Sequence, residues 1–72
     1  MSWISHQLLP AIAGVMRQHH AAPRTPATPA ELSRWLRANG DCAEAEFMAH
    51  LAPGPGFRAL VQMAHAMLSQ EE

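Results

Sequence analysis

Three side chains with metal-binding or nucleophilic chemistry follow one another along a predicted helix. Cys42, Glu46 and His50 are spaced at i, i+4 and i+8, which places them along one side of that helix. His19 and His20 offer further nitrogen ligands from the end of an earlier helix. Strong structural zinc sites, however, are built on paired motifs such as C-x-x-C or H-x-x-x-H, and the sequence has neither. We therefore expect no metal at these residues.

The same cysteine and histidine do not make a nucleophilic pair. A catalytic thiol and its base must lie within hydrogen-bond reach, and Cys42 and His50 are too far apart along one helix to meet. No orienting third group or oxyanion donor accompanies them. The sequence therefore predicts a protein that is not an enzyme and that carries no cofactor.

A proline- and glycine-rich tract, 52–56, precedes the last predicted helix and puts Arg58 in its first turn. A positive charge at that end opposes the helix dipole, so the arginine could receive an anion or a partner's carboxylate. A P-loop is excluded, because no Gly-Lys-Ser/Thr follows and the preceding segment is helical. We favour a simpler interpretation, in which the tract is the turn of an αα-hairpin and Arg58 is exposed.

Amphipathic segments predict an all-α domain of three to four short helices, with the hairpin in its C-terminal half. The expected helices span about 5–20, 29–38, 42–51 and 57–68. Pro10 either kinks the first helix or begins its main part. Thr28 to Glu31 and Asp41 to Glu44 each match a capping box, which predicts the starts of the second and third helices. Gly40 is the expected left-handed residue that ends the second helix.

Two apolar faces should pack inside this domain. The last helix has the clearer one, whose members recur at i, i+3, i+4 and i+7: Phe57, Leu60, Val61, Ala64, Met67 and Leu68. The third helix is expected to turn Ala43, Phe47 and Leu51 inward. Glu71 and Glu72 carry the wrong charge for the C-terminal end of the dipole, so we expect the last turn to fray.

The segment 21–28 is a proline-rich linker between the first two helices. Its prolines, with Pro29, recur every third residue, as along one edge of a polyproline II helix. Such an edge can dock into an aromatic groove, or the segment can act as a stiff spacer. The arginine beside the prolines stands in no standard recognition register, which favours the spacer.

The second and third helices, joined at Gly40, invite comparison with a DNA-binding helix-turn-helix. In that arrangement Asp41, Glu44 and Glu46 would point toward phosphates and repel them. The five arginines are scattered and the formal net charge is −1, so no basic patch forms. We expect no nucleic-acid partner.

Length, cysteine content and hydropathy set the remaining bounds. The 72 residues fit one domain, 1–72, whose core would bury only about 60–65% of the unfolded surface. With a single cysteine, no internal disulfide can support this core, and oligomerisation is a common substitute. The apolar run 8–16 is too short to span a bilayer, and no Lys or Arg precedes it as in a signal peptide. We expect a cytoplasmic protein with no membrane contact.

Methionines and one tryptophan suggest where a partner binds. Met48 and Met63 fall beside the main apolar faces, so part of the apolar surface should remain exposed. Trp3 is costly to leave in water and is a residue type that commonly anchors interfaces. We predict an interface at Trp3, Met63 and Met67, with Arg58 at its rim.

These observations predict a small non-catalytic protein–protein interaction module. It would act as an accessory subunit, an adaptor or a small inhibitor of a larger protein, or assemble as a homo-oligomer. The alternatives are a small helical regulator that binds nucleic acid and a zinc-stabilised helical module.

Overall fold

The computed structural model describes residues 3–19 and 25–70, and every regular element in those ranges is helical. The elements in order are η1 (Ile4–Leu8), α1 (Leu9–Gln18), α2 (Pro29–Ala38), α3 (Cys42–Ala49) and α4 (Pro55–Gln70). The predicted all-α fold is confirmed, and each α-helix begins or ends within a few residues of its expected position. None of the helices in these ranges is long and apolar enough to cross a membrane.

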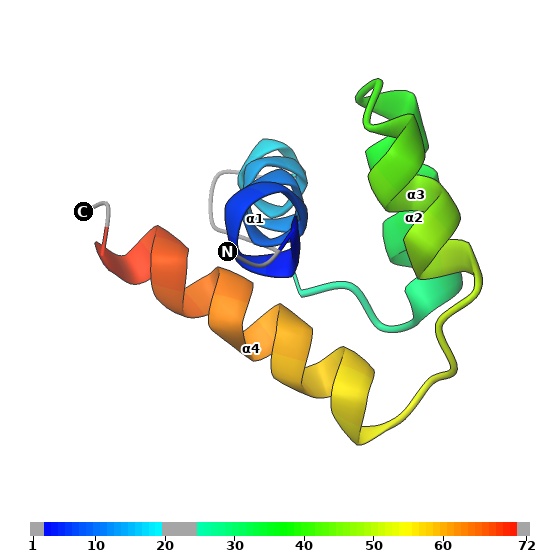
Figure 1. Ribbon diagram of the computed structural model, residues 1–72. Helices are drawn as coiled ribbons and strands as arrows, with labels where there is room; N and C mark the ends of the chain where they lie inside the picture. The colour runs from blue at the N-terminus through cyan, green and yellow to red at the C-terminus, as the bar shows by residue number, and fades with distance from the viewer. Residues whose placement is uncertain (1–2, 20–24, 71–72) are drawn as a thin grey trace.

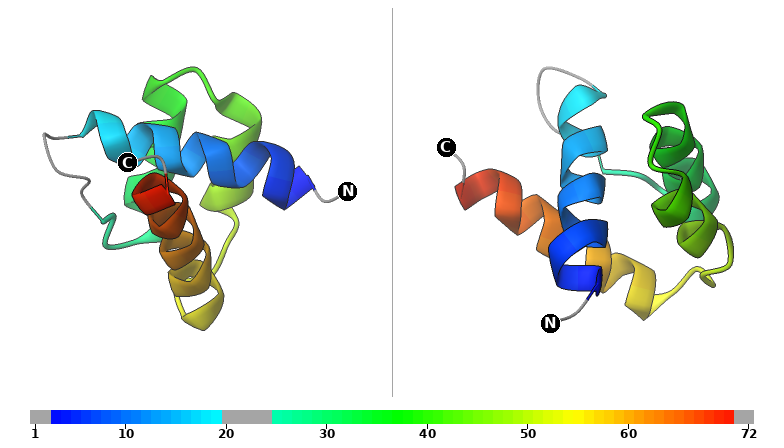
Figure 2. Two further views of the ribbon diagram at one scale, coloured as in Figure 1. Left: turned by 90° about the vertical axis from the view of Figure 1, so that its left-hand side faces the viewer. Right: turned by 45° about the horizontal axis from the view of Figure 1, so that its top comes forward.

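Helix α1 lies at the centre of the arrangement. α4 crosses α1 on one side, α2 packs against α1 on another, and α3 lies along α2 (Figures 1 and 2). The side chains that point from α1 and its preceding turn into this junction are completely buried: Leu8, Ile12, Val15 and Met16. The core therefore joins two helix pairs, α1 with α4 and α2 with α3.

Pro10 stands in the first turn of α1, and the turn before it is wider than an α-helical turn. In η1 the N–H of Leu9 donates to the carbonyl of Ile4, five residues back. A proline ring inside a regular helix would crowd the carbonyl four residues earlier, here that of His6. The wide turn and the position near the start of α1 accommodate the ring.

The start of α2 follows the predicted capping box. Thr28 has an extended backbone, and its hydroxyl accepts a hydrogen bond from the N–H of Glu31 at 3.1 Å. The Glu31 carboxylate reaches back and accepts from the N–H of Ala27 at 2.7 Å. Pro29 occupies the first helical position, where its missing N–H costs nothing.

The turn between α2 and α3 is a Schellman motif centred on Gly40. Gly40 has φ 88°, the left-handed conformation that favours glycine. Its N–H donates to the carbonyl of Arg37 at 3.1 Å, and the N–H of Asp41 donates to that of Leu36 at 2.9 Å. The prediction that Gly40 ends α2 is confirmed.

The second predicted capping box is wrong. Asp41 precedes α3, but its side chain makes no capping hydrogen bond. The backbone of Asp41 takes part in the Schellman turn. Its ψ is 67°, whereas a capping residue usually adopts an extended conformation. Its carboxylate instead accepts from the side-chain amide of Asn39 at 2.9 Å.

The inward face predicted for α3 is only partly correct, because Phe47 and Leu51 pack against the core whereas Ala43 does not. Ala43 is exposed and Phe47 and Leu51 are half-buried, whereas Ala45 and Met48 are completely buried. A hydrogen bond between α2 and α3 accompanies this orientation: the Ser33 hydroxyl donates to the carbonyl of Ala45 at 2.8 Å. The apolar residues of α3 itself lie on several sides of the helix. Contact with α2 therefore decides which of these residues are buried.

The expected αα-hairpin across the proline- and glycine-rich tract does not form. α3 pairs with α2, and α4 leads away from α3 to cross α1 (Figure 1). The helices around Gly40 form the close pair instead. The broad apolar face of α4 needs a large apolar partner, and α1 supplies one whereas α3 buries only Ala45 and Met48.

Gly54 and Pro55 begin α4. Gly54 has φ 154° and its carbonyl accepts from the N–H of Arg58 at 3.0 Å, which closes the first turn. Pro55 fits the first helical position, so the helix starts two residues before the expected Phe57. The predicted apolar face is confirmed, with Met67 half-buried and its other five members buried. The expected fraying concerns Glu71 and Glu72, which lie outside the described residues.

The proline-rich linker is described from Thr25 onward, and residues 20–24 of it and of the preceding helix end lie outside the described residues. Pro26 and Pro29 are both buried. Their rings are therefore covered by the protein itself and are not presented to an aromatic groove. This burial agrees with the spacer interpretation for the described part of the segment.

We expect Leu60→Asp to lower the free energy of unfolding by about 3–5 kcal/mol, because it places an unpaired charge in the core. Leu60 is 8% exposed in the middle of the buried face of α4. Urea denaturation followed by circular dichroism measures the change. His65→Asp, at an exposed position of the same helix, is the control and should shift stability by about 0.5 kcal/mol or less. Equal midpoints for the two variants would show that this face is not buried.

Ser33→Ala should cost about 1 kcal/mol, since it removes the buried hydrogen bond between α2 and α3. Ser33 is 6% exposed, so water cannot easily replace its hydroxyl. Thermal or urea unfolding should detect the loss, with the exposed Ser69→Ala as the matched control. A Ser33→Ala variant as stable as the control would contradict the contribution of this bond.

Candidate interaction surface on the last helix

Helix α4 has a face that packs on the core and a face that meets solvent. Phe57, Leu60, Val61, Ala64 and Leu68 are buried. The opposite side, here called the outer face, consists of Ala59, Gln62, Met63 and Ala66, all exposed. Met63 is 45% exposed and stands out as an exposed large hydrophobic side chain. The outer face therefore combines an exposed methionine with small and uncharged neighbours.

Charge is unevenly divided between the two helix pairs. Across η1, α1 and α4, the only acidic or basic residues apart from histidine are Arg17 and Arg58. α2, α3 and their connecting turn hold six charged residues: Glu31, Arg34, Arg37, Asp41, Glu44 and Glu46. A solvated helix usually carries charged residues opposite its apolar face. The α2–α3 pair follows that pattern, and α4 does not.

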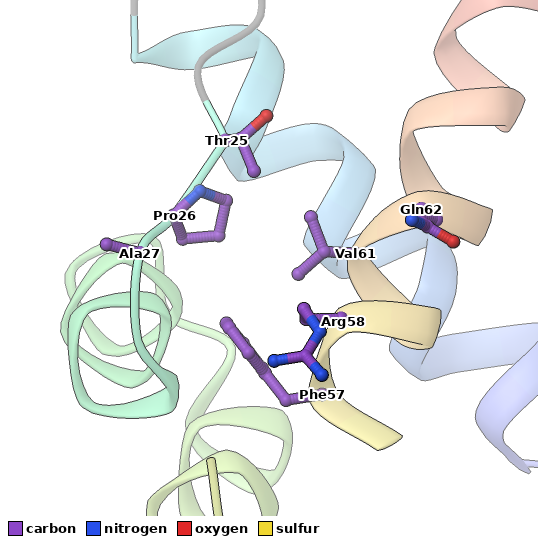
Figure 3. A pocket seen from close by; sticks show the side chains of 7 residues that line it. All are labelled: Thr25, Pro26, Ala27, Phe57, Arg58, Val61 and Gln62. Carbon is purple, nitrogen blue, oxygen red and sulfur yellow. The ribbon is translucent and has the colours of Figure 1, made fainter. Parts of the chain in front are cut away.

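An open hollow of about 250 Å³ adjoins the first turns of α4. Pro26 lies opposite Phe57 and Val61 across it, with Arg58 and Gln62 also lining it (Figure 3). Thr25 and Ala27 complete the lining. Mostly apolar groups thus surround one guanidinium and one amide, an arrangement suited to an apolar side chain with a nearby carboxylate. Gln62 belongs to both the hollow and the outer face, so the two surfaces are continuous.

Arg58 is exposed, as the sequence predicts. Within the part of the chain that the structure describes, its guanidinium makes no hydrogen bond or ion pair. Its backbone N–H closes the first turn of α4, where a positive charge is unfavourable to the helix dipole. The side chain is therefore available to a negative group from outside the chain.

The remaining predicted interface residues lie in different surroundings. Trp3 is half-buried and meets Phe47 edge to face, with ring centroids 5.4 Å apart and planes at 61°. The tryptophan thus has an aromatic contact within the chain, and its role in an interface stays a prediction. Met67 is half-buried beside the core. Met48 is completely buried, so the inference that it lies outside the core is wrong.

The candidate metal ligands are only partly brought together. Nε2 of His50 lies 3.4 Å from Oε1 of Glu46, and both side chains are exposed. Cys42 is an exposed free cysteine, and His20 lies outside the described residues. Within residues 3–19 and 25–70, no three His, Cys, Asp or Glu side chains are grouped so that they could hold a metal ion.

His19 is engaged in a contact that the sequence analysis missed. Its ring stacks on Trp35 of α2, with centroids 3.9 Å apart and planes at 18°. The stack ties the C-terminal end of α1 to α2. The hollow beside Pro26 was missed as well, because a proline spacing gives no indication of which distant helix will cover it.

We expect purified, untagged protein to contain no stoichiometric zinc, and a chelator to leave its melting temperature unchanged. The reason is that Cys42 is exposed and that no ligand cluster surrounds it within the described residues. Elemental analysis and thermal unfolding with and without chelator provide the measurements. One tightly held zinc per chain that disappears in Cys42→Ala would overturn this expectation.

Comparisons of the chain with models of protein families, with curated proteins and with solved structures find no match. The function therefore has to be argued from the surfaces of this chain.

Proposed function

We propose that this chain is a small, non-catalytic protein–protein interaction module of the cytoplasm, and that it contacts its partner through the outer face of α4. In this role it serves as an accessory subunit, adaptor or small inhibitor of a larger protein, or assembles with copies of itself. The observation that carries the proposal is the exposure of Met63 within a helix face that has no charged residue.

The composition of the outer face suits burial against another protein. The buried centres of interfaces are depleted in charged residues and enriched in methionine. Met63 supplies a flexible apolar side chain that can adapt to an irregular surface. Ala59 and Ala66 are small, which lets a second helix approach closely. A face made only for contact with water would gain solubility from charges, and this one has none.

Arg58 and the hollow add a polar edge to the same surface. Interfaces usually surround an apolar centre with polar groups that fix the orientation of the partner. Arg58 can donate charge-assisted hydrogen bonds to a carboxylate, and its guanidinium has no partner within the described residues. The α2–α3 pair, whose helices and connecting turn carry six charged residues, is the side that we expect to remain in solvent.

The test compares the same substitution on the two sides of the molecule. Ala66→Glu places a charge on the outer face of α4. Ala49→Glu places a charge at an exposed position of α3. Ala49 is the last residue of α3 and Ala66 lies about one turn before the end of α4, so the helicity of each variant has to be measured as well. Each tagged variant is purified from its native cells, and the chains recovered with it are quantified by mass spectrometry.

We expect Ala66→Glu to lower recovery of the partner, whether another protein or untagged copies of the chain, by about tenfold or more. Ala49→Glu should recover as much partner as the unaltered protein. Circular dichroism must show the same helicity for both variants. Undiminished recovery with Ala66→Glu would contradict the proposed use of this face.

A further inference from the structure

We infer that the hollow between residues 25–27 and the first turns of α4 binds the C-terminal residue of a partner chain, one that has an apolar side chain and a free carboxylate. The inference rests on the proposed function, because it names the part of the partner that reaches the molecule at this place. Two neighbouring rows of side chains on α4 carry it, one apolar and one polar.

The apolar row forms one wall of the hollow. Phe57 and Val61 are spaced at i and i+4, so they lie on the same side of α4. They are 4% and 5% exposed, and Pro26, which is also buried, lies opposite them across the hollow (Figure 3). An apolar side chain that enters between the proline and this row would be removed from water, which favours binding.

The polar row runs beside the apolar one. Arg58 and Gln62 are likewise spaced at i and i+4, and both line the hollow with exposed side chains. No acidic residue belongs to the lining, and the Arg58 guanidinium has no partner within the described residues. The first turn of α4 adds the positive end of the helix dipole. The charge at the hollow is therefore complementary to a negative group.

The two rows together favour the end of a peptide chain. In a C-terminal residue the side chain and the carboxylate are attached to the same carbon atom, so they can occupy adjacent rows at the same time. Arg58 can donate two parallel hydrogen bonds to the carboxylate. The side-chain oxygen of Gln62 can accept the N–H of the same residue.

The size of the hollow favours one side chain over a free small molecule. Sites for free ligands are usually pockets of roughly 300–1,000 Å³ that enclose most of the ligand. This hollow has about 250 Å³ and is open to solvent. One side chain fits, and the rest of the partner chain would lie outside, where Gln62 joins the hollow to the outer face of α4.

Both walls are held in place by contacts within the chain. The N–H of Ala27 donates to the Glu31 carboxylate at 2.7 Å, which ties the proline side of the hollow to the start of α2. Phe57 and Val61 belong to the hydrophobic core. A site that is already formed loses little conformational entropy when a ligand binds, so even a short peptide should bind measurably.

The test titrates the isotope-labelled full chain with short peptides and follows its backbone amide signals by NMR. The probe is acetyl-Gly-Gly-Leu with a free carboxylate. We expect a Kd on the order of 1 mM, with the largest shifts at residues 57–62. Two matched peptides should each bind about fivefold more weakly or less: the amidated form, which lacks the charge, and acetyl-Gly-Gly-Gly, which lacks the apolar side chain.

A variant shows whether Arg58 binds the carboxylate. Arg58→Gln should weaken binding of the free-acid peptide by about tenfold and leave binding of the amidated peptide unchanged, because only the first peptide carries the charge. Arg34→Gln, at an exposed arginine on α2, is the control and should change neither affinity. The comparison of acid with amide in one variant separates loss of this contact from damage to the fold, which would weaken both.

Equal affinity for acid and amide, or tight binding of the acid by Arg58→Gln, would overturn the inference. Isocaproate, which has the leucine side chain and the carboxylate without a peptide group, should bind more weakly than the peptide, and equal binding would overturn the chain end as the ligand. If no peptide binds while Ala66→Glu still loses its partner, this inference fails and the proposed function stands. Peptide binding together with undiminished partner recovery by Ala66→Glu would support the hollow and contradict the outer face.

Discussion

Burial of α1 is the interaction on which the rest of this structure depends. Leu8, Ile12, Val15 and Met16 lose all contact with water, and at about 25 cal/mol for each Å² of apolar surface these side chains contribute strongly to the core. α4 covers one side of α1, and α2 covers another. Two aromatic contacts hold the ends of the segment formed by η1 and α1 against the α2–α3 pair. Trp3 contacts Phe47 at one end, and His19 contacts Trp35 at the other.

This central position explains which surface is left open. A helix that packs on one neighbour covers one face, and α4 packs mainly on α1 because the chain after Gly54 leads it away from α3. Its outer face remains uncovered, and it has little charge to attract water. The α2–α3 pair is covered on its inner side, and its helices and connecting turn carry six charged residues. The molecule thus has one side rich in charged residues and one side poor in them, and the proposed interactions belong to the second.

Local chemistry could be predicted wherever neighbouring residues decide the outcome. The cap at Thr28, the end of α2 at Gly40 and the buried face of α4 follow from side chains only a few positions apart in the sequence. The cap at Asp41 could not be predicted, because the Schellman turn fixes the backbone of the same residue in another conformation.

The sequence by itself determined that this chain is helical, where its helices start and stop, and which side of α4 is apolar. Spacing of apolar residues, capping side chains, prolines and glycines act over one or two turns, so they are readable without the fold. Only the tertiary structure decided that α4 packs on α1 and that α3 turns Ala45 and Met48 inward. It also decided that Met48 is buried and Met63 exposed. Several apolar helix faces could pack against one another in this chain. The spacing of apolar residues shows that each face exists but does not show which two faces pack together.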